Sequence, residues 1–114
     1  MEKPERRERV RTSLECYWGL TEACPRNGKI TSLSTRGCFI KTTAEAGEGQ
    51  TVYLNCWLPS DLQGRLESEP WMMVRGRVIY HLEKIGFGMQ FTELTAAEND
   101  IVLLLIEHFR NDRV

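Results

Sequence analysis

The stretch "WMMVRGRVIYHLEKIGFGMQFTE", residues 71–93, predicts two strands that meet at a turn near Lys84. In its first half, apolar residues alternate with Arg75 and Arg77, which is the period-two pattern of a strand with one buried and one solvated face. Glycines inside strands mark places where a sheet bends tightly. This stretch contains three of them, Gly76, Gly86 and Gly88. It therefore predicts a strongly curved antiparallel sheet with both arginines on the solvent side.

Four more strands are predicted on the N-terminal side of this pair. The first begins at Leu14, because Leu14, Cys16 and Trp18 alternate with polar residues. The other three are the segments 29–33, 37–43 and 51–59. The segment "CPRNGK", residues 24–29, has the composition of a tight turn, whereas residues 60–70 show no apolar period and are expected to form a long exposed connection.

The C-terminal part of the chain predicts a helix. Thr95 and Glu98 have the T-x-x-E spacing of a capping box, and Ile101, Leu105 and Phe109 then recur near the helical period. The apolar face of such a helix needs a partner to pack against. Together the elements predict a mainly β fold, a six-stranded antiparallel barrel with a C-terminal α-helix packed on it.

The composition is that of a single folded domain, with 114 residues, of which 41% are apolar and 27% charged. Residues 1–12 lack apolar periodicity and are expected to form a flexible N-terminal arm, while residues 13–114 form the domain. The longest apolar run, residues 101–106, is too short for membrane insertion, and the N-terminus is charged where a secretory signal would be apolar. We therefore expect a cytoplasmic protein.

Neither the cysteines nor the histidines form a recognisable metal or catalytic motif. The four cysteines, Cys16, Cys24, Cys38 and Cys56, have no C-x-x-C spacing and are expected to be buried reduced thiols. The sequence contains no G-x-S-x-G, P-loop, H-E-x-x-H or G-x-G-x-x-G motif, and packing or solvation is the simpler role for His81 and His108. We expect no catalysis, no metal and no cofactor.

The formal net charge of −1 hides an uneven distribution. Residues 1–41 contain nine basic and five acidic side chains, a net charge of +4, whereas residues 42–114 contain six basic and eleven acidic ones, a net charge of −5. A protein that neutralises many phosphates along a nucleic acid needs a larger basic excess. The distribution favours a small anionic ligand over a long polyanion.

Two short motifs in the basic half could hold such a ligand. Arg7 and Arg11 form R-x-x-x-R within "RRERVR", and "SLSTRG" follows at residues 32–37. Each motif alone is weak, since it also fits a solvated basic arm or a plain serine-rich turn. Arginine forks match the O6 and N7 acceptors of guanine and stack on purines. Ser34 can exchange hydrogen bonds through its hydroxyl, and Gly37 permits a positive φ that would bring backbone N–H groups close to a ligand.

The two motifs occur in this order and spacing ahead of "GFGMQF" and a terminal helix. In this arrangement the sequence resembles the PilZ domain family, whose members bind the bacterial second messenger cyclic di-GMP. Family members carry R-x-x-x-R at the entrance to the first strand, matched here by Arg7 and Arg11. They also carry [D/N]-x-S-x-x-G between the second and third strands. Ser34 and Gly37 match the last two fixed positions, whereas Ser32 stands where the family has Asp or Asn.

The resemblance spans residues 6–109 and implies which residues contact the ligand. These are Arg7, Arg11, Ser32, Ser34 and Gly37, with Arg36 and Arg6 as further candidates. Arg9 lies inside the first motif but occupies none of its fixed positions, so its side chain is expected to matter little. A serine hydroxyl at position 32 replaces a charged acceptor for the guanine N1–H and N2–H groups, which costs about 1 to 2 kcal/mol, or roughly tenfold to thirtyfold in affinity.

The resulting hypothesis is a non-enzymatic receptor whose arm closes over cyclic di-GMP and relays the signal to an unidentified protein effector, as a monomer or a homodimer. The alternative is a degenerate adaptor of the same fold that binds only protein. A barrel for single-stranded nucleic acid comes third. The downstream target and the ligand stoichiometry do not follow from the sequence.

Overall fold

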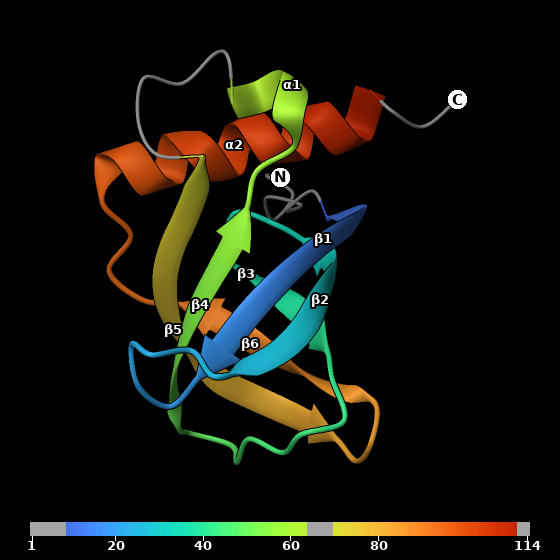
Figure 1. Cartoon of the computed structure of the whole chain (residues 1–114), viewed down its shortest axis with the longest axis vertical. Helices are drawn as coiled ribbons and strands as arrows, with labels where there is room; N and C mark the ends of the chain where they lie inside the picture. Colours follow the sequence, from blue (N-terminus) through green and yellow to red (C-terminus); the bar gives the residue numbers. More distant parts are fainter. Residues whose placement is uncertain (1–8, 64–69, 112–114) are drawn as a thin grey trace, which may run out of the picture.

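The computed structural model describes residues 9–63 and 70–111, which form a barrel with two helices at one end (Figure 1). Six antiparallel strands close the barrel in the order β1-β2-β3-β6-β5-β4. The elements are β1 (Val10–Gly19), β2 (Arg26–Leu33), β3 (Gly37–Lys41), β4 (Thr51–Trp57), α1 (Ser60–Gln63), β5 (Trp71–Leu82), β6 (Gly86–Phe91) and α2 (Ala96–Asn111). The predicted fold class, a six-stranded antiparallel barrel with a C-terminal helix, is confirmed.

The strand β1 begins earlier than the sequence pattern predicts, at Val10 instead of Leu14. Val10 is buried, and it pairs with Leu33 of β2 across the antiparallel ladder. Residues 10–12, which the sequence assigns to the arm, therefore belong to the barrel. The preceding residues of the predicted arm, 1–8, lie outside the described residues.

The strand β2 also begins early, at Arg26, inside the segment 24–29 that the sequence predicts as a turn. Arg26 pairs with Trp18, and its guanidinium carbon lies 5.6 Å from the centroid of the indole ring, a cross-strand cation–π contact. The chain reversal therefore falls at residues 20–25, where Cys24 takes the left-handed conformation with a φ of 47°.

The connection 60–70, predicted to be exposed throughout, contains the short helix α1. Leu62 of this helix is buried in the core, and Oδ2 of Asp61 lies 3.2 Å from Nδ1 of His108 on α2. The prediction of an exposed connection is thus wrong for α1, because burying the leucine favours ordering of the turn. Residues 64–69 lie outside the described residues.

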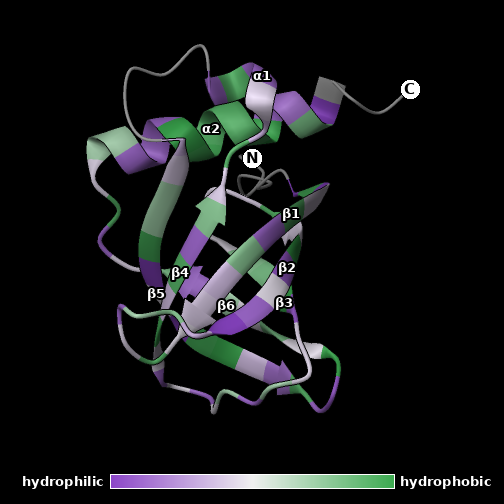
Figure 2. Ribbon diagram, viewed as in Figure 1, coloured by the Kyte–Doolittle hydropathy of each residue, from purple (hydrophilic) through white to green (hydrophobic). Residues whose placement is uncertain are grey.

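The helix α2 begins where the capping box predicts. The backbone N–H of Thr95 donates to the Glu98 carboxylate at 2.9 Å, and the N–H of Glu98 donates to the Thr95 hydroxyl at 3.1 Å. Hydrophobic residues run along α2 (Figure 2), and the helix packs on β1 and β5, burying Val102 and Leu105 completely. Within the described residues, neither helix is long and apolar enough to cross a membrane.

All four cysteines are buried and free of disulfides, as predicted. Cys16 and Cys56 pair across the β1–β4 ladder. Burial raises the pKa of the Cys16 and Cys38 thiols well above the ordinary range and the pKa of Cys56 to about 12. A thiolate in this apolar interior would lose its hydration, so the thiols stay protonated and act as core residues.

We expect the free energy of unfolding to fall as the pH rises above 9. An unfolded thiol loses its proton near its ordinary pKa of 9.0, whereas folded Cys56 keeps it until about 12, so the unfolded state binds fewer protons between these values. For one thiol, the loss between about pH 8 and about pH 10 is about 1.4 kcal/mol. Urea unfolding at both pH values measures it. Between these pH values the free energy of unfolding of Cys56→Val should decrease by about 1.4 kcal/mol less than that of wild type. Equal decreases in the two proteins would contradict the prediction.

Candidate ligand-binding site

The loop between β2 and β3 is built around the hydroxyl of Ser34. This side chain is 2% exposed, and its Oγ accepts hydrogen bonds from the backbone N–H of Arg36 at 3.2 Å and of Gly37 at 3.3 Å. The N–H of Ser34 donates to the Gly37 carbonyl at 2.9 Å, which closes the turn. Serine favours such turns because its hydroxyl replaces a backbone partner. The serine of the second motif therefore sets the shape of the loop.

Gly37 is needed for strand packing and not for an unusual backbone angle. A glycine permits a positive φ here, but the structure does not use this freedom, because the glycines with positive φ in the described residues are Gly49 and Gly86. Gly37 instead pairs with Gln90 of β6. A Cβ at this position would overlap the carbonyl oxygen of Met89 and lie 3.0 Å from its carbonyl carbon. Any larger residue would push β3 away from β6.

Arg9 reaches the loop directly, although the sequence predicts no important role for it. Its Nη1 donates to Oγ of Ser32 at 2.8 Å, and its Nη2 lies 3.5 Å from Oγ of Ser34. The expectation that Arg9 matters little follows from its place between the fixed positions of the first motif, whereas the structure brings its guanidinium to Ser32 because β1 starts at Val10. The sequence feature that indicates this earlier strand start is Val10, the apolar residue between Arg9 and Arg11.

Arg11 lies on the same part of the surface. It is exposed in β1 and is the Cα partner of Ser32 across the β1–β2 ladder. Directly opposed residues of an antiparallel pair project from the same face, so the two side chains share one side of the sheet. The other predicted arginines, Arg6 and Arg7, lie outside the described residues. The structure thus brings Arg9, Arg11 and the serine loop together.

A depression of about 300 Å³ opens beside this loop. It is lined by Arg9, Ser34, Arg36, Gly37, Ile79, Met89 and Gln90. Among the described residues, two arginines and no acidic side chain contribute to this lining, which suits an anion. Ile79 is 50% exposed and offers apolar surface, on which a planar ring can pack. The contributions of β5 and β6 could not be found from the sequence, because no local motif marks them.

The closed six-stranded barrel and its C-terminal helix define a small β-barrel domain with a basic depression on its surface. A family model described as PilZ domain matches residues 5–107, so the chain belongs to the PilZ domain family. The resemblance inferred from the two motifs is confirmed. A search of curated protein sequences gave no match.

Solved structures of PilZ proteins share the fold. The chain matches the Bacillus subtilis inhibitor of motility MotI/DgrA with a TM-score of 0.74 and 13% identity, over 99% of this chain and 54% of that chain. It matches the PilZ domain of YcgR from Escherichia coli, solved with c-di-GMP, with a TM-score of 0.73 and 11% identity, over 96% and 94% of the two chains. It matches the PilZ domain of CeSA from a cellulose-synthesizing bacterium with a TM-score of 0.64 and 16% identity, over 90% of this chain and 98% of that chain. At these identities the likeness concerns the fold, and the chain spans about half of the Bacillus protein.

Proposed function

We propose that this PilZ domain is a receptor for cyclic di-GMP. The observation that carries the proposal is the hydrogen bonding of Arg9 to Ser32 and Ser34 beside a basic depression of the barrel surface. Membership of the PilZ family supports it, and so does the fold shared with an Escherichia coli domain solved with c-di-GMP. The proposed function is binding alone and includes no catalytic step.

Each proposed ligand-binding group has a distinct task. Arg7 and Arg11 hold guanine and phosphate through paired N–H donors, which give short, charge-assisted hydrogen bonds. Arg9 and Arg36 add positive charge at the rim, and Arg6 is a further candidate. The hydroxyls of the serine loop complete the polar contacts, while the exposed Ile79 packs against a purine ring.

Signalling then follows from a change in the N-terminal arm. The arm precedes β1, whose first residue, Val10, is anchored in the core. In this proposal the arginines of the arm extend to a ligand above the serine loop. Closure of the arm over the ligand would alter the surface presented to a protein effector. A degenerate adaptor of the same fold would bind its protein partner without responding to the nucleotide.

We expect Ser32→Asp to tighten cyclic di-GMP binding by about tenfold, because it restores a charged acceptor for the guanine N1–H and N2–H groups. Isothermal titration of both proteins with cyclic di-GMP and cyclic di-AMP measures the effect. Cyclic di-AMP should gain nothing, since adenine presents a different donor pattern. Thr35→Asp is the matched control, because it adds the same charge at an exposed position of the same loop.

The same titration tests the proposed function itself. Heat of binding from wild type with cyclic di-GMP supports the receptor. If neither wild type nor Ser32→Asp gives heat at high ligand concentration, the adaptor is favoured instead. An equal gain for both nucleotides would contradict the role proposed for position 32.

A further inference from the structure

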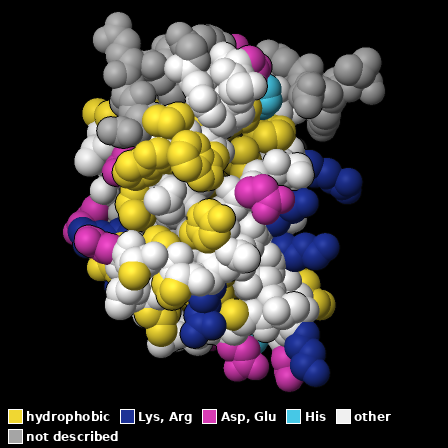
Figure 3. Space-filling model, viewed as in Figure 1, with side chains coloured by type: hydrophobic (Ala, Val, Ile, Leu, Met, Phe, Trp, Pro, Cys, Tyr) yellow, Lys and Arg dark blue, Asp and Glu magenta, His cyan; other side chains and the backbone are white. Residues whose placement is uncertain are grey.

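A second surface with the character of a binding site lies on the outside of β1, β4 and β5. We call it the β4 face and define it by Tyr17, Trp57, Trp71 and Met73. Tyr17 is 47% exposed and Trp57 is 51% exposed, while the other two are half-buried. Hydrophobic side chains gather over these strands in Figure 3. Exposed aromatic clusters of this kind mark interaction surfaces.

The strand register makes the β4 face continuous. Trp57 pairs with Trp71 across the β4–β5 ladder. Asn55, the next outward residue of β4, pairs with Tyr17 on one side and Met73 on the other. These side chains therefore form two adjacent rows on one side of the sheet. Because the barrel is closed, a partner cannot add a strand to it and must bind these side chains.

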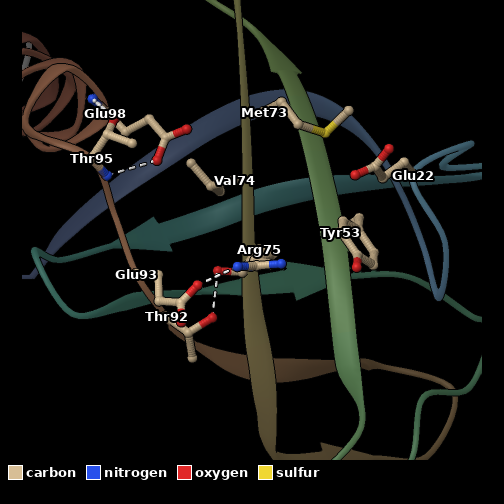
Figure 4. A pocket seen from close by; sticks show the side chains of 9 residues that line it. All are labelled: Glu22, Tyr53, Met73, Val74, Arg75, Thr92, Glu93, Thr95 and Glu98. Atoms are coloured by element: carbon tan, nitrogen blue, oxygen red, sulfur yellow. Dashed lines mark hydrogen bonds and ion pairs between the residues drawn. The ribbon is translucent and has the colours of Figure 1, made fainter.

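An acidic depression of about 240 Å³ adjoins the β4 face and shares Met73 with it (Figure 4). It is lined by Glu22, Tyr53, Met73, Val74, Arg75, Thr92, Glu93, Thr95 and Glu98. Three glutamates thus face one arginine. Arg75 is exposed, as predicted, and already pairs with Glu93, an interaction that raises the pKa of the guanidinium.

Of the other two glutamates in the acidic depression, Glu22 has a carboxylate that is available to pair with a cation from a partner. Glu98 accepts the N–H of Thr95 at the helix start. The carboxylate of Glu22 makes no hydrogen bond or ion pair within the described part of the chain. Figure 4 shows Glu22 on the same side of the depression as the ring of Tyr53. A cation placed there would meet both a carboxylate and an aromatic face.

We propose that the β4 face docks a segment of another protein that presents a lysine or arginine among apolar residues. The apolar residues cover Trp57 and its neighbours, and the basic side chain enters the acidic depression beside Glu22. Charge complementarity favours a basic segment of another protein, since two copies of this chain that paired through the same face would place their acidic depressions against each other. The acidic C-terminal part, with six basic and eleven acidic side chains in residues 42–114, agrees with this choice.

This docking surface is independent of the nucleotide proposal. In the part of the chain that the structure describes, the acidic depression and the basic depression at the serine loop share no lining residue. Docking can therefore be measured without cyclic di-GMP, and a negative result at one surface leaves the other open to test.

The test is selection of phage-displayed random peptides of about twelve residues on the whole protein, followed by titration of the synthetic peptides against intrinsic tryptophan fluorescence. We expect enriched peptides to combine a lysine or arginine with apolar residues. Glu22→Lys and Trp57→Ser should each weaken their binding by about tenfold or more. Glu83→Lys and Leu103→Ser, at other exposed positions, are the matched controls and should leave it unchanged. Circular dichroism verifies that all four variants fold.

Three outcomes would overturn the proposal. The first is that no peptides are enriched, or that the enriched peptides lack a basic residue. The second is equal binding to wild type, Glu22→Lys and Trp57→Ser. The third is a dimer in sedimentation equilibrium that Trp57→Ser dissociates, which would make a second copy of the chain the occupant.

Discussion

Replacing Gly37 with alanine is expected to lower the free energy of unfolding by about 3 kcal/mol. The new Cβ would overlap the carbonyl oxygen of Met89, a backbone atom that cannot swing aside as the end of a flexible side chain can. Gly37 also pairs with Gln90 in the β3–β6 ladder, so the overlap is relieved only if the two strands separate. Urea unfolding followed by tryptophan fluorescence measures the loss.

Gly47→Ala is the matched control for this substitution. The nearest atom to a Cβ at Gly47 is the side-chain oxygen of Gln50 at 3.3 Å, which can move. We expect this variant to change stability by less than about 1 kcal/mol. If Gly37→Ala were no more destabilising than Gly47→Ala, close packing of β3 on β6 would not be the reason for a glycine in the second motif.

Arg7→Ala and Arg11→Ala are each expected to weaken cyclic di-GMP binding by about 2 kcal/mol or more, roughly thirtyfold, because each removes charge-assisted hydrogen bonds to the ligand. Folding should be nearly unchanged for Arg11→Ala, since the side chain is exposed and the neighbouring pair of Val10 with Leu33 stays in place. Isothermal titration gives the affinities, and thermal unfolding verifies the fold.

Two further arginine variants sharpen this measurement. Arg9→Ala removes the hydrogen bond to Ser32, and we expect an intermediate loss of about fivefold. Arg77→Ala removes an exposed arginine of β5 that does not line the basic depression, and its affinity should equal that of wild type. Unchanged affinity in both Arg7→Ala and Arg11→Ala would remove the arginine clamp from the proposed mechanism.

The sequence alone determined the features that depend on neighbouring residues. Period-two alternation predicted the strands, and the spacing of Thr95 and Glu98 predicted the start of α2, because a capping box forms within one turn. Buried reduced cysteines were predicted from the absence of C-x-x-C spacing and of a secretory signal, and all four are buried. The spacing of the two motifs was sufficient to indicate the PilZ family, since it reflects chain order and not long-range contacts.

The tertiary structure decided what depends on segments far apart in the chain. Val10 belongs to β1 because Leu33 pairs with it, and this pairing brings Arg9 to the serine loop. Gly37 is a glycine because the backbone of Met89 lies against it. Ile79 joins the same depression from β5. Residue patterns report the period of one strand, whereas the register between strands and the closure of the barrel determine which side chains meet.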